Sequence, residues 1–269
     1  RSEISEPEYV EFYKHIAHDL TDPLTWSHNR AEGKREYTSL LYVPARAPLD
    51  LWNRETPRGI KLYVQRVFIT DEGGQFLPLY MRFVRGVLDA SDLPLNVSRE
   101  LVQHDPAITT IRMALTKRVL DMLEKLAADD AGNYAVFWRE FGAVFKEGLA
   151  EDVPNQKKIG ELLRFNTTRS AATEQDRSLA QYVRDAIAGQ KLIYFLVAES
   201  PQAARASPLL ETLVARGIEV LLLTDRLDAW VIQHLTEFEG KALRDVGRGD
   251  LELPGEAAPA PPPAEPSKE

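Results

Sequence analysis

The sequence predicts an α/β protein with two α-β-α sandwich subdomains, a larger one first and a smaller one with a parallel sheet second, joined by a helical connector. The chain has 269 residues, of which 44% are hydrophobic and 28% charged, so it is long and apolar enough to bury two cores. Strand-like runs and helical stripes occur in the first half, and the two periods alternate after residue 170. Such alternation is typical of a parallel sheet covered by helices.

Breaks in this pattern give the expected boundaries. We predict a large subdomain at residues 1–128, a helical connector at 129–170, a small subdomain at 171–250 and a disordered tail at 251–269. The connector ends where the polar run Asn166-Thr-Thr-Arg-Ser170 interrupts the helical pattern. The tail consists mainly of Pro, Ala and Glu, a composition that favours an extended, disordered chain.

The large subdomain begins with a helix, because apolar residues recur at helical spacing from Pro7 to Leu20, where Asp22-Pro23 ends the run. Runs rich in β-branched and aromatic residues predict one strand at 36–43 and another at 60–70. A short helix from Pro78 and a third strand at 84–88 follow. Prolines exclude regular structure between the first two strands, and we expect the apolar residues there to pack against the core: Leu49, Leu51 and Trp52.

Helical stripes dominate the middle of the chain. Apolar residues step by threes and fours from Ile108 to Leu126, and an aromatic stripe from Tyr134 to Phe145 predicts a second helix whose rings form core. A shorter helix is expected at 155–163. The small subdomain should contain strands at 191–198, 218–223 and 241–246, with helices at 178–187 and 226–235 and two more opened by Ser-Pro pairs at 200 and 207.

Composition excludes several classes of function. A net charge of −8 and a pI near 5.3 disfavour nucleic acid and anionic membrane as partners. The absence of cysteine excludes disulfides and thiolate chemistry, and no apolar run reaches the length of a membrane span. His15 and His18 have no third ligand nearby, so we predict no metal site. A cytoplasmic protein fits these features, and a start at Arg without a signal-peptide pattern suggests an excised fragment.

The segment between the third strand and the long helix carries the most specific chemistry. Asn96 and Ser98 are good N-caps, so a helix should begin near Ser98 with Arg99 in its first turn and Gln103 beside it. A guanidinium binds two phosphate oxygens at once, which makes such an arginine suitable for a phosphoryl-transfer site. From the residues alone, a solvated arginine or a pair with a nearby acid such as Asp92 is the commoner outcome, and both interpretations stay open.

Several motifs follow one family pattern in order from about residue 7 to residue 246: Phe12-Tyr-Lys14, Tyr42-Val-Pro-Ala-Arg-Ala-Pro48, Ile60-Lys-Leu-Tyr-Val-Gln-Arg-Val-Phe-Ile-Thr-Asp71, Asp92-Leu-Pro-Leu-Asn-Val-Ser-Arg-Glu-Leu-Val-Gln103, Ala114-Leu-Thr-Lys-Arg-Val119, Phe137-Trp138, Leu162-Leu-Arg-Phe165 and Gly217-Ile-Glu-Val-Leu-Leu-Leu-Thr-Asp225. In this order they resemble the middle domain of the heat shock protein 90 chaperone family, of the bacterial HtpG type. The colinear set carries the resemblance, rather than any single motif.

The resemblance implies the middle segment of an ATP-dependent molecular chaperone. ATP and Mg would be bound by an N-terminal domain missing from this chain, and Arg99 would contact the γ-phosphate with Asn96 and Gln103 in support. The fragment alone would bind no cofactor and have no activity. A homodimer would form only in the full-length protein, through a downstream domain.

The resemblance also implies two protein-binding surfaces. Trp230 and Phe68 would bind unfolded or partly folded client proteins, and Trp230 lies at the shoulder of an apolar helical stripe. Ala229 departs from the family, which has an acid there. Lys117 and Arg118 would bind a seventy-kilodalton partner chaperone of the DnaK type, although charges on the outer face of an amphipathic helix commonly serve only solubility.

A second hypothesis is a free-standing α/β enzyme that binds a small metabolite at its parallel sheet. The sequence has neither a Gly-x-Gly-x-x-Gly fingerprint nor a Walker-type glycine loop, and no histidine stands beside a nucleophile. These absences favour the chaperone segment.

Overall fold

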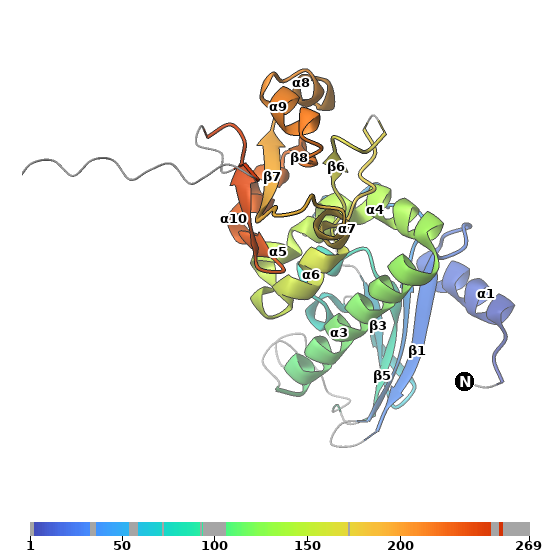
Figure 1. The fold of residues 1–269 in the computed structure, drawn as a ribbon. Helices are drawn as coiled ribbons and strands as arrows, with labels where there is room; N and C mark the ends of the chain where they lie inside the picture. Colours follow the sequence, from blue (N-terminus) through green and yellow to red (C-terminus); the bar gives the residue numbers. More distant parts are fainter. Residues whose placement is uncertain are drawn as a thin grey trace, which may run out of the picture. The chain divides into compact units, whose positions relative to one another are not determined.

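The structure, a computed structural model, describes residues 3–32, 36–53, 59–71, 73–91, 93, 106–171, 173–248 and 253–254. The chain divides into two compact units, Arg1–Arg164 with Gln233–Leu235 and Phe165–Ile232 with Thr236–Glu269. Within the described residues, each unit contains a five-stranded sheet with helices around it (Figure 1). The predicted fold class is confirmed.

The sheet of the first unit has the strand order β1-β2-β5-β3-β4. Its strands are β1 (Thr25–Ala31), β2 (Tyr37–Val43), β3 (Ile60–Val64), β4 (Val67–Thr70) and β5 (Arg85–Ala90). Neighbouring strands are antiparallel except for β3 and β5, which run parallel. The strand β5 is therefore central, and β1 and β4 form the two edges.

Helices cover both faces of this sheet. The helix α1 (Glu6–Ala17) packs Tyr9, Tyr13 and Ile16 against Leu40 and Tyr42 of β2. Because successive strand residues point to opposite faces, Leu41 and Val43 face the other side, and both are fully buried there. The long helix α3 (Pro106–Asp129) contacts β1, and Figure 1 shows it on the side of the sheet opposite α1.

The helix that follows α3 packs through aromatic side chains. The helix α4 (Ala131–Lys146) buries the predicted stripe, in which Phe141 stacks on Phe83 at 4.9 Å between ring centroids. Arg82, only 6% exposed, donates to both carboxylate oxygens of Glu147 at 2.7 and 2.9 Å. Short helical segments complete this part: η1 (Gly73–Phe76), η2 (Leu79–Met81), α5 (Gly148–Glu151), η3 (Val153–Asn155) and α6 (Gln156–Leu162).

The sheet of the second unit has the order β6-β8-β7-β10-β9. The strands β7 (Leu192–Val197), β8 (Val220–Leu223) and β10 (Lys241–Asp245) are parallel, as the sequence predicts, whereas the edge strands β6 (Asn166–Thr167) and β9 (Glu237–Phe238) are antiparallel to their neighbours. Four helices accompany this sheet in the described residues: α7 (Leu179–Arg184), α8 (Pro201–Arg205), α9 (Leu209–Ala215) and α10 (Asp228–His234).

Three expectations for the first unit are wrong. The first helix ends at Ala17, where His18 adopts a left-handed conformation, and Leu20 is 92% exposed. The strand β1 is absent from the predicted elements. The expected single strand at 60–70 is a hairpin, because Gln65 and Arg66 turn the chain with φ values of 51° and 67°. Such a two-residue turn usually contains Asn-Gly or Asp-Gly, and Gln65-Arg66 carries neither signal.

The proline-bordered segment after β2 also differs from expectation. Leu51 is 1% exposed and packs as predicted, but Trp52 and Leu49 are exposed. Within the described ranges, none of the helices has the length and apolarity that crossing a membrane requires.

Candidate functional site

The arginine loop begins at the carboxyl end of β5, and Arg99, Asn96 and Gln103 themselves lie outside the described residues. Two neighbours hold the end of β5. The backbone N–H of Ser91 donates to the carbonyl of Glu36 at 3.1 Å, and the N–H of Arg66 donates to Oδ1 of Asp89 at 3.1 Å. Leu93 is then 4% exposed. The loop therefore starts from a fixed point on the central strand.

Phe68 lies on the edge strand β4, where its ring and that of Tyr63 on β3 form an apolar surface that we call the β4 patch. Val67 and Phe68 are 53% and 52% exposed. The ring of Tyr63 meets that of Phe68 edge to face, with 5.6 Å between centroids. Val67 pairs with Val64 and points to the opposite face from Phe68, so Phe68 and Tyr63 form the apolar surface that suits an apolar partner.

Lys117 and Arg118 both lie on α3 but have different surroundings. Lys117 is exposed and pairs with Asp121 at 2.8 Å, one helical turn away. Arg118 is half-buried. Burial raises the pKa of Tyr37, and the positive charge of Arg118 partly offsets that rise. The two cations thus do not form one uniform patch.

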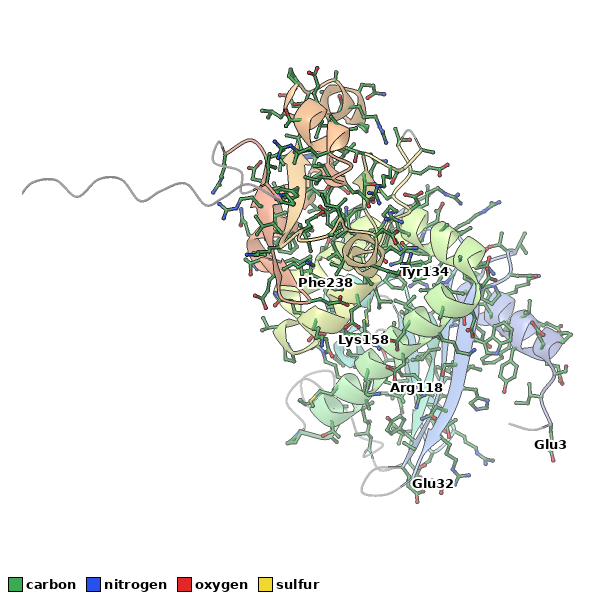
Figure 2. The ribbon with its side chains drawn as sticks, viewed as in Figure 1. Glu3, Glu32, Arg118, Tyr134, Lys158 and Phe238 are labelled. Carbon is green, nitrogen blue, oxygen red and sulfur yellow. The ribbon has the colours of Figure 1, made fainter. Side chains whose placement is uncertain are left out.

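Arg118 lines a hollow beside β1, which we call the β1 hollow, with a volume of about 530 Å³. Its walls are residues 25–28 of β1, Tyr9 of α1 and four side chains of α3: Arg118, Asp121, Met122 and Lys125. Figure 2 shows Arg118 on α3 beside this strand. Aromatic, basic and small polar groups meet there, so the hollow is equipped for a mixed polar and apolar ligand.

Trp230 lies on α10 in the second unit and is half-buried. Its neighbour Val231 is fully buried, and Asp228 is 2% exposed because its carboxylate accepts the backbone N–H of Asp225 at 2.9 Å. Val231 and Asp228 thus both help to fix this helix. A half-buried indole on such a helix keeps part of its ring accessible.

The predicted surface residues of the first unit do not form a single site. Phe68 and the β1 hollow lie at opposite edges of the first sheet, since β4 and β1 end the strand order. Trp230 belongs to the second unit. No group of three potential metal ligands among His, Asp and Glu occurs in the described part of the chain.

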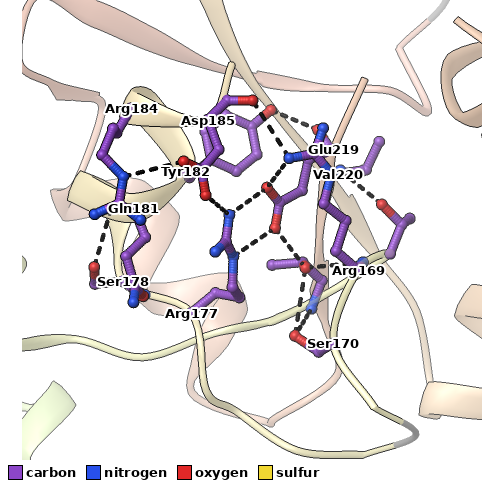
Figure 3. A network of polar contacts seen from close by, with 12 residues as sticks. Arg169, Ser170, Arg177, Ser178, Gln181, Tyr182, Arg184, Asp185, Glu219 and Val220 are labelled. Atoms are coloured by element: carbon purple, nitrogen blue, oxygen red, sulfur yellow. Dashed lines mark hydrogen bonds and ion pairs between the residues drawn. The ribbon is translucent and has the colours of Figure 1, made fainter. Parts of the chain in front are cut away.

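A polar network in the second unit was not foreseen (Figure 3). The carboxylate of Glu219 is 2% exposed and accepts from Nε and a terminal nitrogen of Arg177 at 2.9 and 2.8 Å. The hydroxyl of Thr167 donates to the same carboxylate at 2.7 Å. The hydrogen bond to Glu219 raises the pKa of Arg177. This network connects the first segment of the second unit to Glu219, the residue that immediately precedes β8.

The comparisons with known proteins decide the family. The model of the family described as Hsp90 protein matches residues 1–261. The chain is 58% identical over 253 residues to the chaperone protein HtpG of Shewanella pealeana and 59% identical over 250 residues to that of Salmonella typhi, covering 94% and 93% of this chain. The chain belongs to the Hsp90 protein family.

Structural similarity agrees with this Hsp90 assignment and indicates which domain of the family the chain corresponds to. The middle domain of a Plasmodium falciparum protein described as a heat shock protein superposes with a TM-score of 0.79 at 29% identity, over 92% of this chain and 97% of that one. The chain spans 40% of the length of each HtpG relative. It therefore corresponds to the middle-domain segment of an Hsp90 family protein, and the predicted resemblance is confirmed.

Two features of this Hsp90 segment escaped the sequence analysis. Glu219 stands between Ile218 and Val220 in a run predicted to be a buried strand, and a carboxylate there signals a buried partner. The β1 hollow had no such signal, because Thr25-Trp-Ser-His28 lacks an apolar alternation and α3 reaches it from about 90 residues further along the chain.

Proposed function

We propose that this chain is the middle segment of an ATP-dependent chaperone and that it completes the ATPase site of an N-terminal domain. The observation that carries the proposal is the match of nearly the whole chain to one stretch of relatives named chaperone protein HtpG. A segment of this kind contributes single residues to a site whose nucleotide pocket lies elsewhere. Family membership also favours this function over a free-standing metabolite-binding enzyme.

In the proposed site, Arg99 contacts the γ-phosphate, and Asn96 and Gln103 support it. ATP and Mg are bound by the N-terminal domain and not by this segment alone. An arginine supplied by a neighbouring domain neutralises the charge that develops on the transferred phosphoryl group. The fixed carboxyl end of β5 supports this role, because an arginine loop needs a rigid origin to place one side chain reproducibly.

Client proteins are proposed to bind at Phe68 and Trp230. Both side chains are aromatic and partly accessible, and aromatic anchors contribute much contact energy without requiring a matched sequence. The two residues lie in different units, which suits clients with several exposed apolar segments. Residues 129–170, including α4 and α6, are proposed to act as the connector between the subdomains.

The partner proposed for Lys117 and Arg118 is a seventy-kilodalton chaperone of the DnaK type with an acidic contact surface. Attraction between opposite charges would make this binding weaken with salt. Homodimerisation is assigned to the full-length protein, and the proposed location is the cytoplasm.

Nucleotide binding by the isolated chain tests the proposal. The 269-residue chain should show no ATP hydrolysis, and ATP with Mg should not shift its melting temperature, because the pocket belongs to another domain. The longer protein carrying this segment serves as the positive control. A thermal shift of the isolated chain, or turnover abolished by a substitution within it, would contradict the proposal and favour a free-standing enzyme.

A further inference from the structure

We propose that the outer edge of β1 accepts an additional β-strand from an extended, acidic segment of a partner protein, seated in the β1 hollow. The inference deepens the partner-binding part of the proposed function and rests on it, because Arg118 belongs to both surfaces. Strand addition supplies affinity through main-chain hydrogen bonds and specificity through the side chains that flank the edge.

The first support is the regularity of β1. Its seven residues pair with β2 without a register shift, from Thr25 opposite Val43 to Ala31 opposite Tyr37. Among the residues that the structure describes, no strand pairs with its other edge. Proteins usually blunt long edges with charged side chains, proline or a bulge, whereas residues 25–31 contain no proline, lysine or bulge and carry one arginine, Arg30, near their end. The other edge strand, β4, has four residues and a register irregularity in its pairing with β3.

The second support is the space beside this edge. Trp26 packs against the α1 core and stacks on Tyr9 with 5.8 Å between ring centroids, and His28 Nδ1 lies 2.8 Å from the hydroxyl of Tyr9. Because side chains alternate along a strand, Thr25 and Ser27 point towards α3. These two side chains are small, so on the α3 side they leave room beside the edge for the side chains of a strand added next to β1 in the plane of the sheet.

The third support is charge. The part of the hollow wall on α3 carries two cations, Arg118 and Lys125, against one carboxylate, Asp121. That carboxylate is already engaged by Lys117 at 2.8 Å and lies 4.0 Å from Nζ of Lys158, while Lys125 is paired with Asp129, so Arg118 is the main source of positive charge in the wall. The hollow is therefore locally positive on a chain whose net charge is −8, so an acidic segment complements it better than a basic one.

A peptide titration on the 269-residue chain tests the proposal. The probe is a heptapeptide of alternating Glu and Val, and the controls are a Lys and Val heptapeptide and two versions of the probe that are N-methylated at alternate residues, one for each edge. The acidic probe should bind and slow amide hydrogen exchange in residues 25–31. One of the two N-methylated probes should bind about tenfold more weakly or worse, because it loses the main-chain donors that face β1.

Matched variants separate charge from a general effect on the helix. Arg118→Glu should weaken the acidic probe and favour the basic one, whereas Arg112→Glu, an exposed arginine of α3 outside the hollow, should change neither. Failure of the acidic probe to bind, equal binding of both N-methylated probes, or equal effects of the two variants would overturn strand addition. The two proposals can fail separately. If the parent chain binds no acidic peptide but Arg118→Glu still loses binding to the partner chaperone, the proposed partner surface is supported and only the added strand is rejected.

Discussion

At the scale of single residues, the buried carboxylate of Glu219 depends mainly on the guanidinium of Arg177. Its charge is 2% exposed, and Arg177 supplies two of its hydrogen bonds while Arg169 approaches only to 3.4 Å. Removing Arg177 would leave this buried charge with the Arg169 contact at 3.4 Å and the hydroxyl of Thr167, and a buried charge that has lost its main partner costs far more than an exposed pair is worth. The network should therefore contribute strongly to the stability of the second unit.

Arg177→Leu should lower the free energy of unfolding of the second unit by about 3 kcal/mol. Amide hydrogen exchange in β7 and β8, followed with increasing urea, measures this unit separately from the first. Arg184→Leu is the control, since that arginine is 69% exposed and its pair with Asp185 is a surface pair, worth about 1 kcal/mol or less. Equal losses in the two variants would show that Glu219 is adequately held by its other partners.

The need for a partner at Glu219 could be predicted from the sequence, but its identity could not. A carboxylate inside an apolar run requires compensation wherever the run folds, whereas Arg177 is 42 residues away and meets it only through the tertiary fold. Phe68 and Trp230 were predicted only through the family resemblance, because their exposure depends on the tertiary fold. The position of Arg118 in a hollow beside β1 could not be predicted for the same reason.

At the scale of elements, local periodicity predicted the long helices well and the hairpin poorly. The apolar stripes of α3 and α4 are local signals, and both helices form where the stripes occur. The turn between β3 and β4 has left-handed conformations at Gln65 and Arg66, which nothing in their side chains favours. Residue Arg66 is held there partly by its N–H bond to Asp89.

Replacing the turn by Asn-Gly should stabilise the first unit. The double change Gln65→Asn and Arg66→Gly relieves two unfavourable φ angles, and the free energy of unfolding should rise by up to about 1 kcal/mol. Arg30→Gly on β1 is the control, because glycine in a regular strand only adds flexibility to the unfolded chain and should destabilise. A lower melting temperature for the Asn-Gly variant would mean that the native side chains hold the turn more strongly than its backbone strain opposes it.

The helix α10 gives the second prediction at this scale. Trp230→Ala should weaken binding of an unfolded model client in a pull-down or anisotropy assay. It should lower the free energy of unfolding by less than the ~3 to 5 kcal/mol typical of a buried aromatic, since the indole is half-buried. Val231→Ala, the adjacent and fully buried position, should lower stability while folded molecules keep their client affinity. Unfolding of the Trp230 variant, or unchanged client affinity, would place the indole in the core.

At the scale of the whole molecule, the sequence could predict two cores but not how the chain is shared between them. Alternating helices and strands after residue 170 indicated a second sheet, and that sheet forms. The return of Gln233–Leu235 to the first unit depends on packing between segments distant in sequence, which periodicity does not report. The chain spans 40% of the length of each HtpG relative. The proposed ATPase must therefore be tested in a longer protein that contains this segment.

The rate of ATP hydrolysis by that longer protein carrying Arg99→Ala tests the central claim most directly. Turnover should fall strongly, with the ~10³- to 10⁵-fold effects of arginines supplied by neighbouring domains as an upper guide. The melting temperature should stay near that of the parent, because the proposed partner of Arg99 is a ligand. Arg112→Ala should leave both quantities unchanged. Parental turnover in the Arg99 variant would contradict the claim that this segment completes the ATPase site.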